Sequence, residues 1–389
     1  MKKVFRNSLA VLALSSLIFI SCSDDENSPT EENPIENPGE SFVANPNDFK
    51  GTISSGTITL DATKEYKLTG SLIIANGGKL IIPAGTKITG TGGTSAYIAV
   101  AQGGKIEVNG TATNPVVMTG AQKVPGNWGG LVICGKAPIN KGATATAEVS
   151  DLTYGGTDVN DNSGSIRYLR IEYAGANFSS EKEFNGLSLF GVGKGTTIEY
   201  VQLHEGSDDG IEFFGGTVNT KYIVSSHNED DQFDWTEGWN GTNEFWFAKQ
   251  SSNSGNRGIE ADNNSNNHLA SPISFPKITN LTLIGRGETG DEPQALKLRV
   301  GTYALIDNVV LSNWKVGIDI QHNESIDAIG TNLKITNVKF ENVTEKSKGK
   351  KTDDSAVDVS AVFVENNNAT GAGSGTNIPN WAQGWTVGL

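Results

Sequence analysis

The sequence contains little cysteine, little proline and few basic residues. Of its 389 residues, 2 are Cys, 12 are Pro and 30 are Lys or Arg, against 44 Asp or Glu. A formal net charge of −14 argues against a nucleic-acid ligand, which needs a basic surface, and is compatible with cations, neutral sugars or simple solubility. Cys134 lies in an apolar run, where we expect a small buried side chain, and there is no zinc-type Cys/His spacing.

Beyond its N-terminus, the chain lacks any apolar run long enough to cross a bilayer. At the N-terminus itself, Lys2, Lys3 and Arg6 precede an apolar run that ends at Ser21 and Cys22. This pattern predicts a signal peptide over residues 1–21. A small residue before Cys resembles a bacterial lipobox, which implies lipidation of Cys22. An ordinary signal peptide with an incidental cysteine is the alternative.

Residues 22–50 are rich in acid and contain several prolines, with no basic residue before Lys50. Such a segment cannot bury a core, and we interpret it as a flexible tether. Its first part, residues 23–27, resembles the surface-export signal of Bacteroidota lipoproteins. That resemblance implies a protein on the cell surface, held at the outer membrane by lipid on Cys22.

From residue 51 onward, short apolar strands recur between glycine-rich and asparagine-rich turns, and the chain has 47 Gly in all. Strands of one kind start at Ile198, Lys221 and Glu244, with a spacing of 23 residues, and later at Ile278, Ile306 and Ile335. A period in the twenties is typical of a parallel β-helix, whereas propeller blades repeat at about 40 to 50 residues. We predict an all-β fold, a single-stranded right-handed parallel β-helix over residues 51–389, and expect a monomer.

A second set of strands can be overlaid as six five-residue stretches that start at positions 186, 210, 232, 258, 295 and 317. Positions two and four are mostly apolar and therefore point inward, so position three points outward. Position three contains Ser188, Glu212, Asp234, Glu260, Lys297 and Asp319 in order, and position five contains Phe190, Phe214, Thr236, Asp262, Arg299 and Gln321. Adjacent like charges destabilise a sheet, so three successive carboxylates indicate a cation, a cationic ligand or chemistry that uses them.

The turns before these strands add further acids and two histidines, His204 and His227, on or near equivalent positions. Calcium binds six to eight oxygen ligands, which adjacent coils could supply. The candidate metal ligands are Asp208, Asp209, Glu212, Asp230, Asp231, Asp234, Glu260 and Asp262. A solvated acidic face with Asp- and Asn-capped turns is the alternative. His204 and His227 are candidate ligand-binding residues.

Several tryptophans flank the acidic turns. Trp235 alternates inward and belongs to the core, whereas Trp239 lies in a turn and could either pack there or stack on a sugar ring. We expect Trp381 and Trp385 to cap the open end of the helix. A run of lysines at positions 346, 348, 350 and 351 predicts a solvated loop.

Particular motifs carry a family resemblance over residues 51–389. They are residues 126–131 (Gly-Asn-Trp-Gly-Gly-Leu), 208–219, 230–239 and 257–263. The chain resembles the right-handed β-helix class typified by pectate lyases, and more closely bacterial surface lipoproteins found with TonB-dependent nutrient transporters. This resemblance implies the fold and a surface location, without settling an activity.

In β-helix polysaccharide lyases, a Lys or Arg removes the proton next to a uronate carboxylate, which calcium often neutralises. The resemblance therefore implies Lys297 as the base, Arg299 as a carboxylate ligand, and Glu260 with Asp262 as calcium ligands. In the alternative, the two cations simply neutralise neighbouring acids. Asp208 and Asp209 also resemble the paired carboxylates of polygalacturonases, but the other motifs of that family are missing.

The leading hypothesis is a surface lipoprotein that binds a glycan, a cation or both as an accessory to outer-membrane nutrient uptake, with a TonB-dependent transporter as partner. One alternative is a calcium-dependent polysaccharide lyase that acts on acidic glycans. The other is an adhesin or structural surface protein without catalysis.

Overall fold

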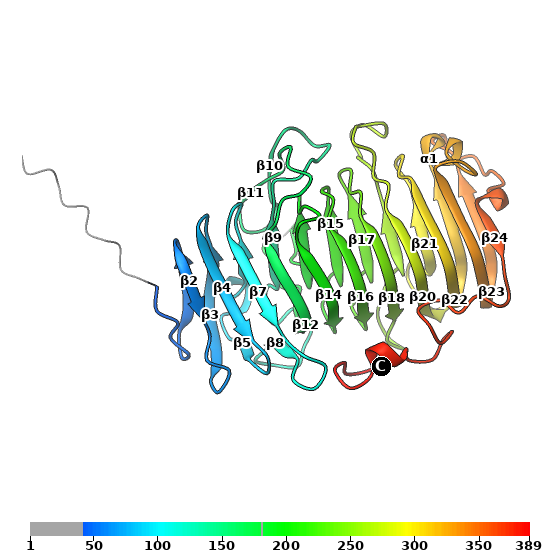
Figure 1. Ribbon diagram of the computed structural model, residues 1–389. Coiled ribbons are helices and arrows are strands. Elements are labelled where there is room, and N and C mark those ends of the chain that lie inside the picture. The colour runs from blue at the N-terminus through cyan, green and yellow to red at the C-terminus, as the bar shows by residue number, and fades with distance from the viewer. Residues whose placement is uncertain (1–41, 180–181) are drawn as a thin grey trace, which may run out of the picture. The chain divides into compact units, whose positions relative to one another are not determined.

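The computed structural model describes residues 42–179 and 182–389 (Figure 1). The predicted signal peptide, the lipidation site Cys22 and most of the predicted tether lie outside these residues. Within them, no helix is long and apolar enough to span a membrane. The described chain is one compact unit that starts at Phe42.

The architecture is the predicted parallel β-helix, in which each strand pairs with its counterpart one coil away. The earlier coils contain β1 (Phe49–Ile53), β2 (Gly56–Thr59), β3 (Glu65–Ile74), β4 (Gly78–Pro83), β5 (Lys87–Gly90), β6 (Ile98–Val100), β7 (Lys105–Asn109), β8 (Val116–Gly120) and β9 (Leu131–Cys134). The later coils contain β12 (Gly164–Glu172), β13 (Leu187–Phe190), β14 (Thr197–His204), β15 (Ile211–Phe214), β16 (Asn219–Ser226), β17 (Phe233–Thr236), β18 (Thr242–Lys249), β19 (Ile259–Ala261), β20 (Lys277–Gly287), β21 (Gln294–Leu298), β22 (Ala304–Gln321), β23 (Leu333–Lys350) and β24 (Phe363–Glu365).

Few other elements interrupt this stack. An antiparallel hairpin, β10 (Ala145–Thr146) with β11 (Thr153–Tyr154), belongs to an insertion between β9 and β12. One short helix, α1 (Asn323–Asp327), follows β22. Three 3₁₀ turns, η1 (Gly93–Ser95), η2 (Ser360–Val362) and η3 (Asn380–Ala382), complete the described elements.

The core is built from columns of apolar side chains that repeat from coil to coil. In one column, Val201 pairs with Ile223, which pairs with Trp246 and then Leu281, and each is buried. Trp235 lies in the core as predicted. Cys134 is also buried, which raises the pKa of its thiol and makes it an unreactive apolar side chain.

A bend in each long strand is marked by a column of residues with positive φ. Tyr168, Tyr200, Tyr222 and Phe245 occupy this corner in successive coils, with φ between 51° and 60°. Their rings stack with centroid separations of 4.3, 4.4 and 5.0 Å. Asparagines then take over the same corner, and Asn308 donates to Asn280 at 2.7 Å. Ring stacking and hydrogen bonds between the asparagine side-chain amides offset the strain of this backbone conformation.

Both ends of the body differ from the sequence-based expectation. The folded body begins before residue 51, because Phe49 is fully buried in β1 and Phe42 packs on the same core. Trp381 and Trp385 do not cap the open end of the β-helix. The C-terminal segment instead returns along the side of the stack, beneath β16 and β18 in Figure 1, where Trp385 packs edge-on against Tyr168 and Tyr200.

The lysine run was expected to be a solvated loop, and the loop assignment is wrong for three of its four lysines, whereas Lys351 lies beyond the strand and is exposed, as are Lys346 and Lys348. Lys346, Lys348 and Lys350 lie in β23, where Lys348 pairs opposite Asp319 and Lys350 opposite Gln321. The pairing of β23 with β22 continues the coil-to-coil hydrogen bonding, which outweighs the poor strand propensity of lysine.

Replacement of Trp385 by Ala should destabilise the folded protein, because the ring is fully buried against the tyrosine column. We expect a loss of about 3 kcal/mol in the free energy of unfolding, measured by denaturant titration. Val364→Ala, at a side chain that is 55% exposed, is the control and should change stability little. Equal stability of the Trp385→Ala variant would contradict this packing.

Candidate functional site

The predicted charge column forms as the sequence indicated. Glu212 in β15 pairs with Asp234 in β17, which pairs with Glu260 in β19. Lys297 and Asp319 then continue the column on β21 and β22. Parallel pairing in register stacks side chains of equal position about 4.8 Å apart, so the three carboxylates are direct neighbours.

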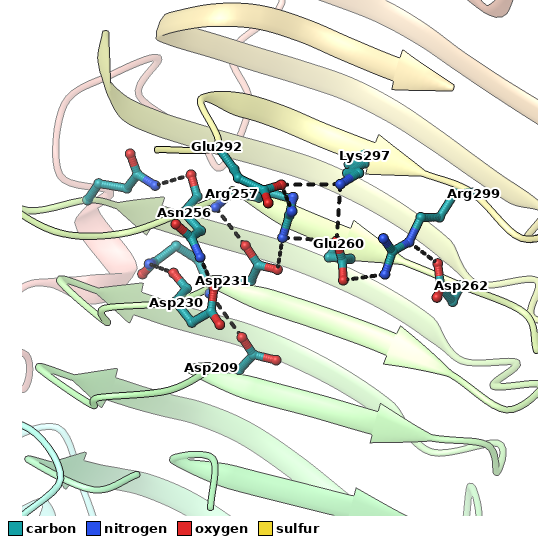
Figure 2. A network of polar contacts seen from close by, with 12 residues as sticks. Asp209, Asp230, Asp231, Asn256, Arg257, Glu260, Asp262, Glu292, Lys297 and Arg299 are labelled. Carbon is teal, nitrogen blue, oxygen red and sulfur yellow. Dashed lines mark hydrogen bonds and ion pairs between the residues drawn. The ribbon is translucent and has the colours of Figure 1, made fainter. Parts of the chain in front are cut away.

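Two further carboxylates lie in the turns before these strands and bind the backbone of the next coil. Asp209 accepts a hydrogen bond from the N–H of Asp231 at 2.9 Å, and Asp231 accepts one from the N–H of Arg257 at 2.6 Å (Figure 2). Asp230 contacts Asn256 in the same region. The predicted alignment of Asp209 with Asp231 is therefore confirmed, and both residues position the turns.

The alternation pattern alone indicated that this acidic column faces open solvent. In the structure the column is buried or half-buried instead. Asp209 is 6% exposed, Asp231 is 3% exposed, and Glu212, Asp234 and Glu260 are half-buried. Asn185 donates to Glu212 at 2.8 Å from the segment ahead of β13. The segments between the strands, such as the one that contains Asn185, therefore cover part of the column. The period of the repeat could not show this cover, because these segments are not periodic.

At one end of the column, carboxylates are neutralised by cations (Figure 2). Arg257 pairs with Asp231 at 3.1 Å and with Glu260 at 2.9 Å, and also contacts Glu292. Arg299 pairs with Glu260 and with Asp262, at 2.7 Å each. Three of the eight predicted metal ligands, Asp231, Glu260 and Asp262, are therefore already engaged by arginine.

At the other end, the carboxylates have no such partner. Within residues 42–179 and 182–389, no Lys or Arg forms an ion pair with Asp208, Asp209, Glu212 or Asp234. Ligand oxygens of Asp209, Glu212 and Asp234 lie within 4.8 Å of one another, as do those of Asp208, Asp209 and Asp230. We call Asp208, Asp209, Glu212 and Asp234 the unpaired carboxylate cluster.

The electrostatics of this cluster follow from burial and like charge. Burial, with Glu183 and Asp230 nearby, raises the pKa of Asp208 to about 8. Burial and neighbouring carboxylates raise the pKa of Asp209, Glu212 and Asp234 well above their ordinary values. Burial raises the pKa of Asp231 to about 7, although Arg257 opposes the shift. A bound cation or shared protons would relieve this repulsion.

Comparison with known proteins places this architecture in a family. A sequence profile described as a pectate-lyase-like beta helix domain matches residues 51–386. The chain belongs to this pectate-lyase-like β-helix family. The match spans all the strands after β1, and so includes every residue of the unpaired carboxylate cluster.

Other comparisons of this β-helix domain add little. A search of curated proteins finds no match. Among solved structures, the enzymatically active domain of tailspike protein 2 from bacteriophage CBA120 is 13% identical, over 79% of this chain and 40% of that one, with a TM-score of 0.25.

Trp239 is not available as a sugar-stacking platform in this β-helix domain. It is fully buried, its ring stacks on Phe213 at 3.8 Å, and its Nε1 donates to the carbonyl of Val218 at 3.1 Å. The residue turns inward because Gly238, at φ +88°, lets the chain bend before it. The expectation of an exposed Trp239 is wrong, and the core-packing alternative holds.

Lys297 and Arg299 lie where the columns placed them. Lys297 Nζ is 3.2 Å from Glu292 and 3.8 Å from Glu260, and Arg299 continues the position of Asp262. Burial and nearby Arg257 lower the pKa of Lys297. Their predicted catalytic roles remain predictions.

Some residues of the site escaped the sequence analysis. Glu148 lies in the insertion that contains β10 and β11, and Glu183 lies just ahead of β13, yet both repel Asp208. Tyr154 and Lys141 hold Glu237 at the same region, at 2.5 and 2.9 Å. Glu148, Glu183, Tyr154 and Lys141 lie outside the repeat, so no periodic signal pointed to them.

The raised carboxyl pKa values predict a pH dependence of stability when cations are removed by chelation. A carboxyl with a raised pKa keeps a proton in the folded state that the unfolded state has released, so stability falls as pH rises through the folded pKa. With Asp231 at about 7 and Asp208 at about 8, the melting temperature should be lower at pH 8.5 than at pH 7.

The variant Glu212→Gln/Asp234→Asn should reduce this dependence, because it removes two carboxyls that have raised pKa values themselves and that raise the pKa of Asp209. Glu229→Gln/Asp327→Asn, at exposed positions, removes the same charge and should leave the dependence unchanged. Identical pH profiles for all three proteins would contradict the assignment.

Proposed function

We propose that the unpaired carboxylate cluster binds Ca²⁺, and that the calcium-loaded site binds a glycan without catalysing its cleavage. The observation that carries this proposal is that the acidic column, together with the acids in the turns beside it, falls into two parts. Arg257 and Arg299 neutralise its later part, whereas no Lys or Arg of the part of the chain that the structure describes pairs with Asp208, Asp209, Glu212 or Asp234. Evenly distributed ion pairs would be expected if the acids served only stability.

Calcium suits this cluster for reasons of ligand type and spacing. Ca²⁺ takes six to eight oxygen ligands at about 2.3–2.6 Å, so oxygens on opposite sides of the ion are up to about 5 Å apart. Two groups of acids share Asp209, and within each group the ligand oxygens lie within 4.8 Å of one another. One group is Asp208, Asp209 and Asp230, and the other is Asp209, Glu212 and Asp234. The amide of Asn185, which now donates to Glu212, could offer its oxygen after reorientation.

The glycan part of the proposal rests on family membership and on the chemistry of calcium. A Ca²⁺ ion held by three or four side chains keeps open positions, which hydroxyl or carboxylate oxygens of a sugar can occupy. Membership in a pectate-lyase-like family supports a glycan over other oxygen-rich ligands. We further propose that the protein is a cell-surface lipoprotein, anchored at Cys22, that assists a TonB-dependent transporter. This part rests on the sequence alone.

One observation favours a second candidate, a calcium-dependent polysaccharide lyase with Lys297 as base. Burial lowers the pKa of Lys297, as general-base catalysis requires. Against it, Lys297 is only 11% exposed in its side chain and is paired with Glu260 and Glu292. A substrate would have to displace these partners, so we prefer binding without cleavage.

Calorimetric titration of Ca²⁺ into the chelator-treated full chain tests the metal site. We expect saturable binding that weakens by at least about tenfold in Asp234→Asn, which removes one charged ligand. The matched control Glu229→Gln, at an exposed acid, should bind normally. Absence of heat and of any rise in melting temperature with Ca²⁺ would overturn the site.

A panel of neutral and acidic glycans, offered with and without Ca²⁺, separates the functional alternatives. Retention without cleavage, lost in Asp234→Asn, is the expected result. Formation of an unsaturated uronate chromophore that disappears in Lys297→Ala would establish the lyase instead. Retention on cells or proteins, with none on glycans, would favour the adhesin.

A further inference from the structure

Two histidines and a glutamate meet at one corner of two successive coils. His204 ends β14 and pairs in register with Ser226, which ends β16. The residues that follow, Glu205 and His227, both have positive φ, at 52° and 61°. They therefore occupy the same corner in adjacent coils, one strand spacing of about 4.8 Å apart.

The distances among the three side chains are too long for hydrogen bonds. Glu205 Oε1 lies 3.7 Å from His204 Nε2 and 4.0 Å from His227 Nδ1, and the two rings are 5.5 Å apart. Ligand atoms of all three residues lie within 4.8 Å of one another. Ligands around tetrahedral zinc are about 3.3 Å apart when each bond is about 2.0–2.1 Å long. Small side-chain rotations would close this difference.

The His204 ring is held by a network behind it. Its Nδ1 lies 3.0 Å from the hydroxyl of Ser226, which also accepts a hydrogen bond from Gln202 at 3.0 Å. Gln202 is fixed in turn by both backbone groups of Val387. Metal-binding histidines are oriented in this way, through a bond to the ring nitrogen that does not bind the metal.

Within residues 42–179 and 182–389, the Glu205 carboxylate lies near both histidines without a direct hydrogen bond to either, its side chain is 38% exposed, and it is close enough to Tyr173 to raise the pKa of that phenol. Burial lowers the pKa of both His204 and His227, which favours the neutral ring. Arg170, a cation close to His204, forms its ion pair with Glu172, at 2.9 Å, and not with Glu205. Neutral imidazole is the form that binds metals.

The other two histidines of the chain provide a contrast. His268 Nδ1 lies 2.9 Å from Glu324, a direct hydrogen bond, and His322 Nδ1 accepts the N–H of Val300 at 3.1 Å. Their rings are 4.9 Å apart, close to the spacing of the first pair. Proximity alone therefore does not distinguish the two histidine pairs. They differ because Glu324 is hydrogen-bonded to its histidine, whereas Glu205 is hydrogen-bonded to neither of its two.

We propose that His204, Glu205 and His227 form a transition-metal site of the zinc type, separate from the unpaired carboxylate cluster. Its two imidazoles and one carboxylate match the ligands of zinc sites that keep a fourth position open for water or another ligand. Calcium prefers oxygen ligands throughout, so the two sites should select different ions.

Visible absorption of Co²⁺ added to the full chain, in excess Ca²⁺, tests this proposal. Tetrahedral Co²⁺ with nitrogen ligands absorbs strongly in the visible range, whereas Co²⁺ in an all-oxygen octahedral site absorbs weakly. We expect one equivalent to produce the strong bands, and Zn²⁺ to abolish them. Affinity should fall at least about tenfold in His227→Ala and in Glu205→Gln.

His268→Ala is the matched control and should retain the bands, as should Asp234→Asn, which tests the calcium site. His227 and Glu205 are more exposed than His204, so their variants should fold, which a melting curve verifies. Bands that are absent from the unmodified protein, or unchanged in His227→Ala, would overturn the zinc-type site. Neither outcome bears on calcium binding, which the Asp234→Asn titration measures separately.

Discussion

Parallel pairing of each strand with its counterpart one coil away is the constraint on which the whole structure depends. It satisfies the backbone polar groups and forces residues of equal position into straight columns. A column of apolar residues, such as Val201, Ile223 and Trp246, becomes core at no electrostatic cost. In a column of carboxylates, each side chain repels the equivalent one in the next coil. The regular stacking of a β-helix therefore increases the electrostatic repulsion between like charges.

The protein resolves that repulsion in only part of the column. Arg257 and Arg299 reach across coils to neutralise Asp231, Glu260 and Asp262, and this part resembles an ordinary structural ion-pair network. In the preceding coils, no Lys or Arg among the described residues pairs with Asp208, Asp209, Glu212 or Asp234, and burial adds to the repulsion. Half-buried carboxylates in that state favour any ligand that brings positive charge, which is why a binding role agrees better with the structure than a merely solubilising one.

The sides of the stack carry a second kind of order. Tyrosines, a phenylalanine and then asparagines fill one corner column, and the C-terminal segment returns over it through Trp381 and Trp385. The same segment secures Gln202, and through Ser226 the ring of His204. The returning segment thus packs on the outer face of coils that are distant from it in sequence. It also orients the ring of His204, which we propose as a metal-binding residue.

The sequence by itself determined the β-helix, its core columns and the alignment of Glu212, Asp234, Glu260, Lys297 and Asp319. Each of these follows from strand periodicity and from equal spacing between coils, which are local properties of the chain. The tertiary structure alone decided the burial of Trp239, the side-on return of Trp385, and the grouping of Glu148 and Glu183 around Asp208. It also decided which acids of one column have arginine partners. These features depend on turns and insertions that obey no period, so their contacts are set by three-dimensional packing.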